Sequence, residues 1–154
     1  MDNKLRVNVD SEAGQTMSVG EIARGGAGSV RLVLPWAVLA QVNHRMVPRA
    51  RGRGLMLSMD YRQRKHAAEL LVVGQMGGRR RFACPVRVEI AFHEPDRRRR
   101  DPSNLLKLIE DAMSGAVYDD DSRIHAESWI RAGVDRTNPR AEIVVTPLAA
   151  EHAA

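Results

Sequence analysis

Apolar and polar residues alternate along several stretches of this chain, and the alternation predicts β-strands. The clearest stretch is Val86–His93 (VRVEIAFH), in which every second residue is a large apolar one. This period is typical of a strand with one packed face and one face that is at least partly wet. Val30–Leu34 shows a similar pattern and is stopped by Pro35. Two further strands are predicted near Ala126–Val134 and Ala141–Thr146, joined by a turn that contains aspartate, asparagine and proline.

A helical pattern begins near Ser58 and continues to Met76. Ser58 or Asp60 is its predicted N-cap, because a short polar side chain can accept a hydrogen bond from the first turn. The pair Gly77–Gly78 is its predicted end, since glycine readily adopts the left-handed conformation that closes a helix. The residues predicted to form much of its packed face are Met59, Ala67, Leu70, Leu71 and Val73.

A second helix is predicted to begin at Asp101. Aspartate is a favourable N-cap, and Pro102 suits the first helical position, where its missing N–H is not needed. Apolar residues then recur at spacings of three and four, and Gly115 is the predicted end. The predicted packed residues are Leu105, Leu108 or Ile109, Ala112 and Met113.

The order of these elements predicts an α+β fold, a single domain in which two helices cover one face of a mixed β-sheet. A chain of 154 residues is long enough to bury one core. We expect the folded domain at residues 29–148, with residues 1–28 as a mobile N-terminal arm and residues 149–154 as a frayed tail. Two arginine-rich segments, around Arg49–Arg53 and at Arg79–Arg81, are predicted to be exposed basic turns.

The charge of the chain narrows the class of partner. There are 24 Lys and Arg residues against 19 Asp and Glu residues, giving a formal net charge of +5, which favours an acidic partner. Because Cys84 is the only cysteine, an intrachain disulfide and a zinc site built from several cysteines are excluded. No apolar run approaches the length needed to cross a membrane, so we expect a cytoplasmic protein with no membrane partner.

Cations and carboxylates meet in the stretch Arg97–Ile124. Four adjacent arginines repel one another unless an anion neutralises their charge, and the phosphodiester backbone is a common such anion. Three adjacent aspartates, Asp119–Asp121, repel in the same way, and Mg²⁺ is a hard cation that takes oxygen ligands. The two runs together suggest metal-assisted phosphodiester chemistry. On these residues alone, the alternative is a solvated basic turn followed by a solvated acidic loop.

The stretch PVRVEIAFHEPDRRRRDPSNLLKLIEDAM, followed by VYDDDSRI, resembles the RusA family of Holliday junction resolvases. In that family a strand leads into basic residues, a D-x-D-N-x-x-K segment opens a helix, and an Asp-Asp pair follows. The segment VLPWAVLAQVNHRM is similar to the family's upstream LPW-and-Asn segment, so the resemblance covers roughly Arg31 to Pro147. It implies a homodimeric, Mg²⁺-dependent endonuclease that resolves four-way DNA junctions by symmetric paired nicks in recombination and repair, with Mn²⁺ as an alternative ion.

The resemblance assigns roles to individual residues. Asp101 and Asp121 fall on catalytic, metal-binding aspartates of the family. Lys107 falls on the lysine of the motif, and we expect it to act catalytically by stabilising charge on the phosphate. Asp120 is the first member of the later pair and a further candidate metal ligand, and Asn104 is the asparagine of the motif, expected to contact DNA.

Ser103 departs from the family pattern, because it stands where the family usually has a second aspartate. A serine hydroxyl can be a neutral metal ligand, but it cannot neutralise Mg²⁺ as a carboxylate does. We therefore expect a weaker metal site, unless the missing charge comes from Asp111, Asp119 or Asp120.

Three functions remain open at this stage: an active junction endonuclease, a junction-binding relative whose cleavage is weakened or lost through Ser103, and a basic interaction protein whose acidic cluster is structural. In the first two, arginines would contact the DNA backbone without reading the bases. The arginines predicted to do so are Arg97, Arg98, Arg99, Arg100, Arg49, Arg51, Arg53, Arg79, Arg80 and Arg81.

Overall fold

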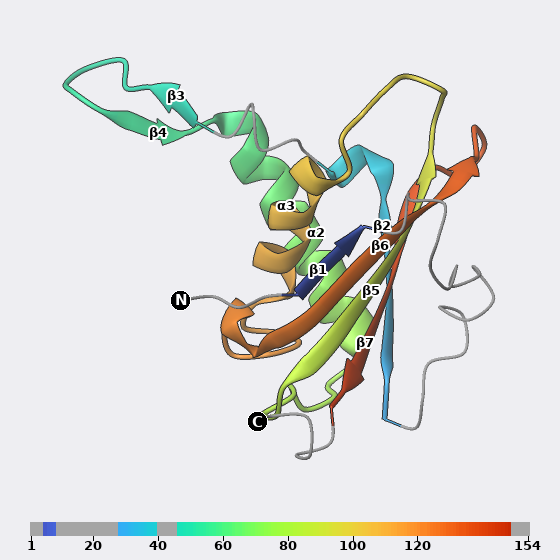
Figure 1. Cartoon of the computed structure of the whole chain (residues 1–154). Helices are drawn as coiled ribbons and strands as arrows, with labels where there is room; N and C mark the ends of the chain where they lie inside the picture. Colours follow the sequence, from blue (N-terminus) through green and yellow to red (C-terminus); the bar gives the residue numbers. More distant parts are fainter. Residues whose placement is uncertain (1–4, 9–27, 40–45, 149–154) are drawn as a thin grey trace.

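A five-stranded mixed sheet forms the centre of the fold, and two helices cover one of its faces (Figure 1). This computed structural model describes residues 5–8, 28–39 and 46–148. The predicted α+β class and the predicted layers are confirmed. In spatial order, the strands are β1 (Leu5–Asn8), β6 (Ile124–Val134), β5 (Val86–Glu94), β7 (Arg140–Pro147) and β2 (Val30–Pro35).

The sheet combines parallel and antiparallel pairs. Strands β1 and β5 both run parallel to β6, whereas β7 runs antiparallel to β5 and β2. The turn between β6 and β7 forms as predicted, with the Asp135 carboxylate accepting hydrogen bonds from the backbone N–H groups of Thr137 and Asn138. Outside the sheet lie helices α2 (Met59–Met76) and α3 (Ser103–Met113), the hairpin of β3 (Met46–Pro48) and β4 (Leu55–Leu57), and the 3-10 turns η1 (Trp36–Val38) and η3 (Asp121–Arg123).

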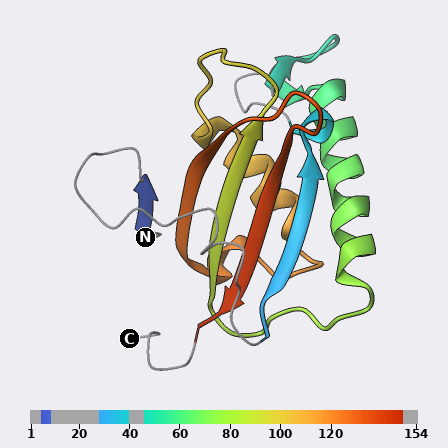
Figure 2. The same cartoon turned by 90° about the vertical axis from the view of Figure 1, so that its right-hand side faces the viewer.

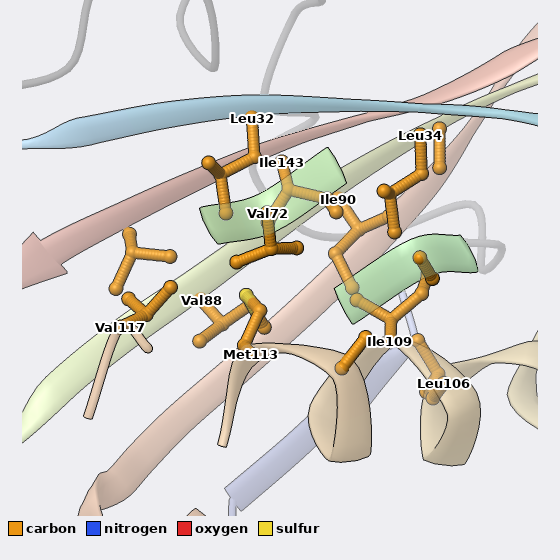
Figure 3. Close-up of a cluster of buried hydrophobic side chains, with 14 of the residues drawn as sticks. Leu32, Leu34, Val72, Val88, Ile90, Leu106, Ile109, Met113, Val117 and Ile143 are labelled. Carbon is orange, nitrogen blue, oxygen red and sulfur yellow. The ribbon is translucent and has the colours of Figure 1, made fainter. Parts of the chain in front are cut away.

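The hydrophobic core lies between the sheet and the helices (Figure 3). Val88, Ile90 and Phe92 of β5 point into it, as the alternation predicted, and each is 0% exposed. The ring of Phe92 makes edge-to-face contacts with Trp36 and with Trp129, at a centroid separation of 6.4 Å in both pairs. Aromatic packing therefore joins η1, β5 and β6 within an otherwise aliphatic core.

Helix α2 has the predicted limits, but it packs through a different face. The Ser58 hydroxyl accepts a hydrogen bond from Tyr61 N at 3.1 Å, and Gly77 closes the helix at φ +55°. The buried residues are Tyr61, Ala68, Val72 and Met76. Of the residues predicted to pack, Ala67 is half-buried, whereas Met59, Leu70, Leu71 and Val73 are exposed. Apolar residues occur on more than one side of α2, and contacts with η1, β2 and α3 decide which side packs.

Helix α3 presents the predicted apolar face to the core. The predicted residues Leu105, Leu108, Ile109, Ala112 and Met113 are all buried. Pro102 already has helical angles, φ −58° and ψ −28°, and the Asp101 carboxylate accepts a hydrogen bond from Ser103 N at 3.0 Å. Asp101 therefore acts as the predicted N-cap, although the regular helix begins at Ser103.

The outer edge of β2 is closed by a side chain of α2. Gln75 Oε1 accepts a hydrogen bond from Val33 N at 2.7 Å, and Gln75 Nε2 donates one to Val33 O at 2.9 Å. Free strand edges invite pairing with other chains, because their backbone groups are unsatisfied. Here one amide satisfies both backbone groups of Val33, as a neighbouring strand would.

The substitution Gln75→Ala is expected to lower the free energy of unfolding by about 1–2 kcal/mol, because it removes two hydrogen bonds worth about 0.5–1.5 kcal/mol each. Urea denaturation followed by circular dichroism measures the change. Gln63→Ala, at an exposed position of the same helix, is the matched control and is expected to stay within about 0.5 kcal/mol of the parent. Equal stability of the two variants would contradict a role for Gln75 at the sheet edge.

One strand and one hairpin were not predicted. Leu5–Asn8, predicted as part of a mobile arm, forms strand β1, which pairs with β6 from Leu5↔Ala126 to Asn8↔Trp129. Four residues are too short a stretch for alternation to be recognised. Arg49–Arg53 is an exposed basic loop as predicted, but it forms the tip of a hairpin whose strands, β3 and β4, were not predicted. The rest of the arm and the predicted tail lie outside the described residues.

Candidate active site

One face of α3 carries Ser103, Lys107 and Asp111, which we call the Lys107 face. Residues four apart in a helix lie one above the other on the same side. Two further carboxylates contact this face from the segments that flank the helix. Asp101 lies two residues before α3, and Asp121 belongs to η3, immediately before β6. The helix thus gathers side chains that are well separated in sequence.

Lys107 is the centre of an ion-pair network. Its Nζ lies 2.9 Å from Asp111 Oδ1, 3.0 Å from Asp121 Oδ2 and 3.9 Å from Glu110 Oε2. Partial burial opposes the charged ammonium, but the hydrogen bonds to Asp111 and Asp121 outweigh it and raise the pKa of Lys107. The ammonium is therefore protonated at neutral pH and pairs with both carboxylates.

Asp101 is bound to the start of its own helix. Its Oδ1 accepts hydrogen bonds from Ser103 N at 3.0 Å and from Ser103 Oγ at 2.6 Å, and the side chains of both residues are exposed. Ser103, which stands at the position of the missing aspartate, therefore holds the Asp101 carboxylate. Asn104 is half-buried, and its backbone N–H donates to Asp101 O at 3.1 Å.

The other two aspartates of the acidic run have structural partners. Asp119 lies 3.4 Å from the guanidinium of Arg81 and 3.2 Å from that of Arg123. Asp120 caps η3, because its Oδ1 accepts a hydrogen bond from Ser122 N at 2.9 Å. Of the three residues considered as a source of the missing charge, Asp111 is therefore the one on the Lys107 face.

The four adjacent arginines divide into two groups. Arg97, Arg98 and Arg99 are exposed on the loop between β5 and α3, which we call the arginine loop. Arg100 instead makes two hydrogen bonds with Asp96, at 2.7 and 3.0 Å, and lies over the ring of Trp36 at 5.5 Å. The Arg100 hydrogen bond, with the Arg98 backbone N–H, lowers the pKa of Asp96 to about 2. Arg100 therefore anchors the arginine loop, and the DNA contact predicted for it stays a prediction.

The remaining predicted DNA-binding arginines lie at two ends of the molecule (Figure 2). The β3–β4 hairpin, with Arg49, Arg51 and Arg53, lies at the same end of the sheet as the arginine loop. The turn after α2, with Arg79–Arg81, lies at the opposite end, where Arg81 also approaches Gly115 O. The structure therefore brings the hairpin and the arginine loop to one end and leaves Arg79–Arg81 apart from them.

Two buried tyrosines border the acidic side of the network and were not predicted. Tyr61 OH donates to Asp111 Oδ2 at 3.4 Å, and Tyr118 OH donates to Glu110 O at 3.1 Å. Burial raises the pKa of Tyr118, and the negative charges of Glu110 and Asp121 add to the effect. Tyr61 comes from α2, so no local spacing in the sequence signals its approach to Asp111.

Comparison with known proteins identifies the class. The family model described as endodeoxyribonuclease RusA matches residues 35–146, well over half of the chain. A comparison with curated proteins found no match. The fold and the family match therefore define a hydrolase that cleaves phosphodiester bonds within DNA.

The chain belongs to the RusA family of Holliday junction-resolving endonucleases. Members of this family bind branched DNA and depend on a metal ion. In the described part of the chain, neither helix is long and apolar enough to cross a lipid bilayer.

Ser103 of the Lys107 face and the two flanking carboxylates fit a hard metal ion in donor type and fall short in number. Asp101, Asp121 and Ser103 offer oxygen atoms, which Mg²⁺ prefers. Within residues 5–8, 28–39 and 46–148, no group of three acidic, histidine or cysteine side chains is arranged to hold a metal ion. One of the two carboxylates, that of Asp121, also pairs with Lys107.

Proposed function

We propose that this chain is a Mg²⁺-dependent endonuclease that resolves four-way DNA junctions by symmetric paired nicks, with Asp101 and Asp121 as its metal-binding carboxylates. One observation carries the proposal: Asp101 and Asp121 both contact the Lys107 face, and three exposed arginines lie on the loop that leads to Asp101. Carboxylates, an ammonium and exposed guanidinium groups are together the side chains that metal-assisted phosphodiester hydrolysis requires.

Ser103 and Lys107 of the Lys107 face act together with Asp101 and Asp121 in the proposed reaction. When bound, Mg²⁺ polarises the phosphoryl group and makes water a better nucleophile. Asp101 and Asp121 hold the ion, and the Ser103 hydroxyl supplies a neutral oxygen. The Lys107 ammonium, protonated at neutral pH, stabilises the negative charge that develops on the phosphate in the transition state.

The DNA backbone is held by side chains around this face. Arg97, Arg98 and Arg99 bind phosphates next to the scissile one, and Asn104 donates a hydrogen bond from the first turn of α3. Arg49, Arg51 and Arg53 contact a more distant stretch on the same end of the molecule. Arg79–Arg81 bind a separate DNA arm, since they lie at the other end.

A homodimer fits the proposed reaction. Symmetric nicks require two equivalent active sites. A dimer with a twofold axis is the smallest assembly that has them. We propose that the reaction takes place in the cytoplasm of a bacterium or of a phage-infected cell. Mn²⁺, which takes similar oxygen ligands, is an alternative ion.

The second candidate function is junction binding with weakened or lost cleavage. It is favoured by Ser103, whose hydroxyl donates to Asp101 Oδ1 at 2.6 Å where the family usually has a second aspartate. In this case the arginines bind the junction as before, but the site has one carboxylate too few for tight metal binding.

A cleavage assay on a synthetic four-way junction tests both functions. Nicks at symmetric positions in two strands of like polarity, dependent on Mg²⁺, are the result expected for the endonuclease. Retention of the junction without nicks supports the binding-only relative. Equal retention of the junction and of a linear duplex of the same sequence, without nicks, contradicts both.

Ser103→Asp is expected to raise the affinity for Mg²⁺ by about tenfold or more, because a second carboxylate next to Asp101 attracts the ion more strongly. Isothermal titration calorimetry with Mg²⁺ alone measures the affinity without reference to cleavage. Gln63→Glu adds the same charge on an exposed part of α2 and is expected to change nothing. If both variants bind Mg²⁺ like the parent, Ser103 does not border the metal site.

A further inference from the structure

The β3–β4 hairpin has apolar residues on both of its faces and no core of its own. Its paired residues are Met46↔Leu57, Val47↔Met56 and Pro48↔Leu55, and directly paired residues lie on the same face of a hairpin. Leu57 packs against the core, but Met46 is 44% exposed and Leu55 is 58% exposed. Both figures that show the whole chain place the hairpin clear of the sheet and helices (Figures 1 and 2). Two-stranded hairpins of this kind are marginally stable in water.

The tip of the hairpin is strongly cationic. Arg49, Arg51 and Arg53 are exposed there, and the segment Met46–Leu57 contains no aspartate or glutamate. Two glycines with positive φ, Gly52 at +100° and Gly54 at +106°, shape the tip. Arg49 N donates to Gly54 O at 3.2 Å and closes it. The tip therefore combines three positive charges with a defined turn.

Charge and apolar surface meet at one place on the hairpin. Arg49, Ala50, Arg51 and Met56 line a shallow hollow of about 420 Å³. A partner that fits this surface must offer anionic groups and flat apolar groups within a few ångströms of each other. A nucleic acid strand with unstacked bases does so, since each base face adjoins its own phosphate.

The position of the hairpin favours DNA over other anionic partners. It leads directly into α2 and lies at the same end of the sheet as the arginine loop, which continues into Asp101 (Figure 2). Apolar side chains such as leucine and methionine are known to enter base steps and unstack them. A branch point, where stacking is interrupted, is the part of a junction most open to such entry.

We propose that the β3–β4 hairpin is a wedge for the branch point of DNA: its arginines hold phosphates while Leu55 and Met56 contact the faces of unstacked bases. This inference rests on the proposed function, because it presumes a branched substrate. It adds that preference for branched over linear DNA comes from the apolar residues of the hairpin, whereas its arginines strengthen binding to both forms alike.

The test uses a four-way junction with 2-aminopurine at the branch point, together with a linear duplex of the same sequence. The parent is expected to raise the fluorescence of 2-aminopurine, which increases on unstacking. The double variant Leu55→Ser, Met56→Ser is expected to lose that increase. Its preference for junction over duplex should fall about tenfold, the effect of removing the burial of one apolar side chain or more. Affinity for the duplex should stay within about twofold.

Two further variants separate the wedge from general effects. Leu70→Ser, Val73→Ser removes two exposed apolar residues from α2 and is expected to behave like the parent. Arg51→Ala is expected to weaken junction and duplex binding alike and to reduce the salt dependence of both by about one counterion. Circular dichroism and thermal unfolding establish that each variant is folded, since Leu55 and Met56 lie outside the core.

The outcomes distinguish this inference from the proposed function. If the parent cuts junctions without raising the fluorescence, the wedge is wrong and the proposed function stands. If the parent neither retains nor cuts junctions, the proposed function fails and the wedge fails with it. A folded Leu55→Ser, Met56→Ser variant that keeps both the fluorescence increase and the junction preference overturns the wedge alone. Hairpin-dependent binding to vesicles of anionic phospholipid in place of DNA also overturns it.

Discussion

Asp121→Asn is expected to lower the rate of junction cleavage by at least about 100-fold, more than the 10- to 100-fold loss typical of residues that only support a metal ligand. Asp101→Asn is expected to have an effect of the same order. Each change removes one of two carboxylate charges from a site that has already lost one at Ser103. Single-turnover cleavage of a labelled junction measures the rate, and gel retention without Mg²⁺ should show junction affinity within about threefold of the parent, because the arginines are intact.

Asp119→Asn is the matched control for these variants. Asp119 belongs to the same run of three aspartates, but its partners are Arg81 and Arg123. Its removal breaks only exposed ion pairs, which contribute little to stability. We expect cleavage within about threefold of the parent. If Asp119→Asn is as inactive as Asp121→Asn, the proposal that Asp121 binds the metal and Asp119 does not is wrong.

Phe92→Ala is expected to lower the free energy of unfolding by about 3–5 kcal/mol, which is a large part of the stability of a domain of this size. Phe92 is 0% exposed, and the substitution leaves a cavity between Trp36 and Trp129. Urea denaturation measures the loss. Because Trp36 also lies beneath Arg100, cleavage by the remaining folded protein should fall as well, as the arginine loop loses its anchor.

Val134→Ala, at the exposed end of β6, is the control for Phe92→Ala. Val134 is 43% exposed, so its truncation leaves no buried cavity and is expected to cost less than about 1 kcal/mol. A loss for Phe92→Ala no larger than this would mean that the three rings do not form a packed unit.

Local patterns in the sequence were sufficient for most of the fold. The spacing of apolar residues in α3 points to a single packed face, and the structure has that face. The alternation in β5 likewise identifies its core-facing residues, but Glu89 and Ala91 on the opposite face, predicted to be at least partly wet, are buried as well. Helix α2 is different, because apolar residues such as Leu70 and Val72 lie on different sides of it, and only tertiary contacts decide between them. Strand β1 was missed because its partner β6 lies almost at the other end of the chain.

Some contacts of the candidate site could likewise be predicted from local sequence patterns, and others could not. Asp101, Lys107 and Asp111 lie close together in sequence, so helical spacing alone places the last two on one face. The approach of Tyr61 to Asp111 depends on the packing of α2 against α3, which no local pattern records. The anchoring of Arg100 by Trp36 likewise depends on contact between distant segments. A run of four similar arginines gave no sign that one of them would be structural.

Strand β1 has a consequence for the order in which the molecule is completed during synthesis. Leu5–Asn8 is made before the other strands of the sheet, yet the strand beside which it lies, β6, emerges only after both helices and β5. This segment must therefore wait for its partner until β6 has left the exit tunnel. Leu5–Asn8 can therefore join the sheet only once β6 has been made, and a ribosome that pauses before β6 would leave this segment open to chaperones and proteases.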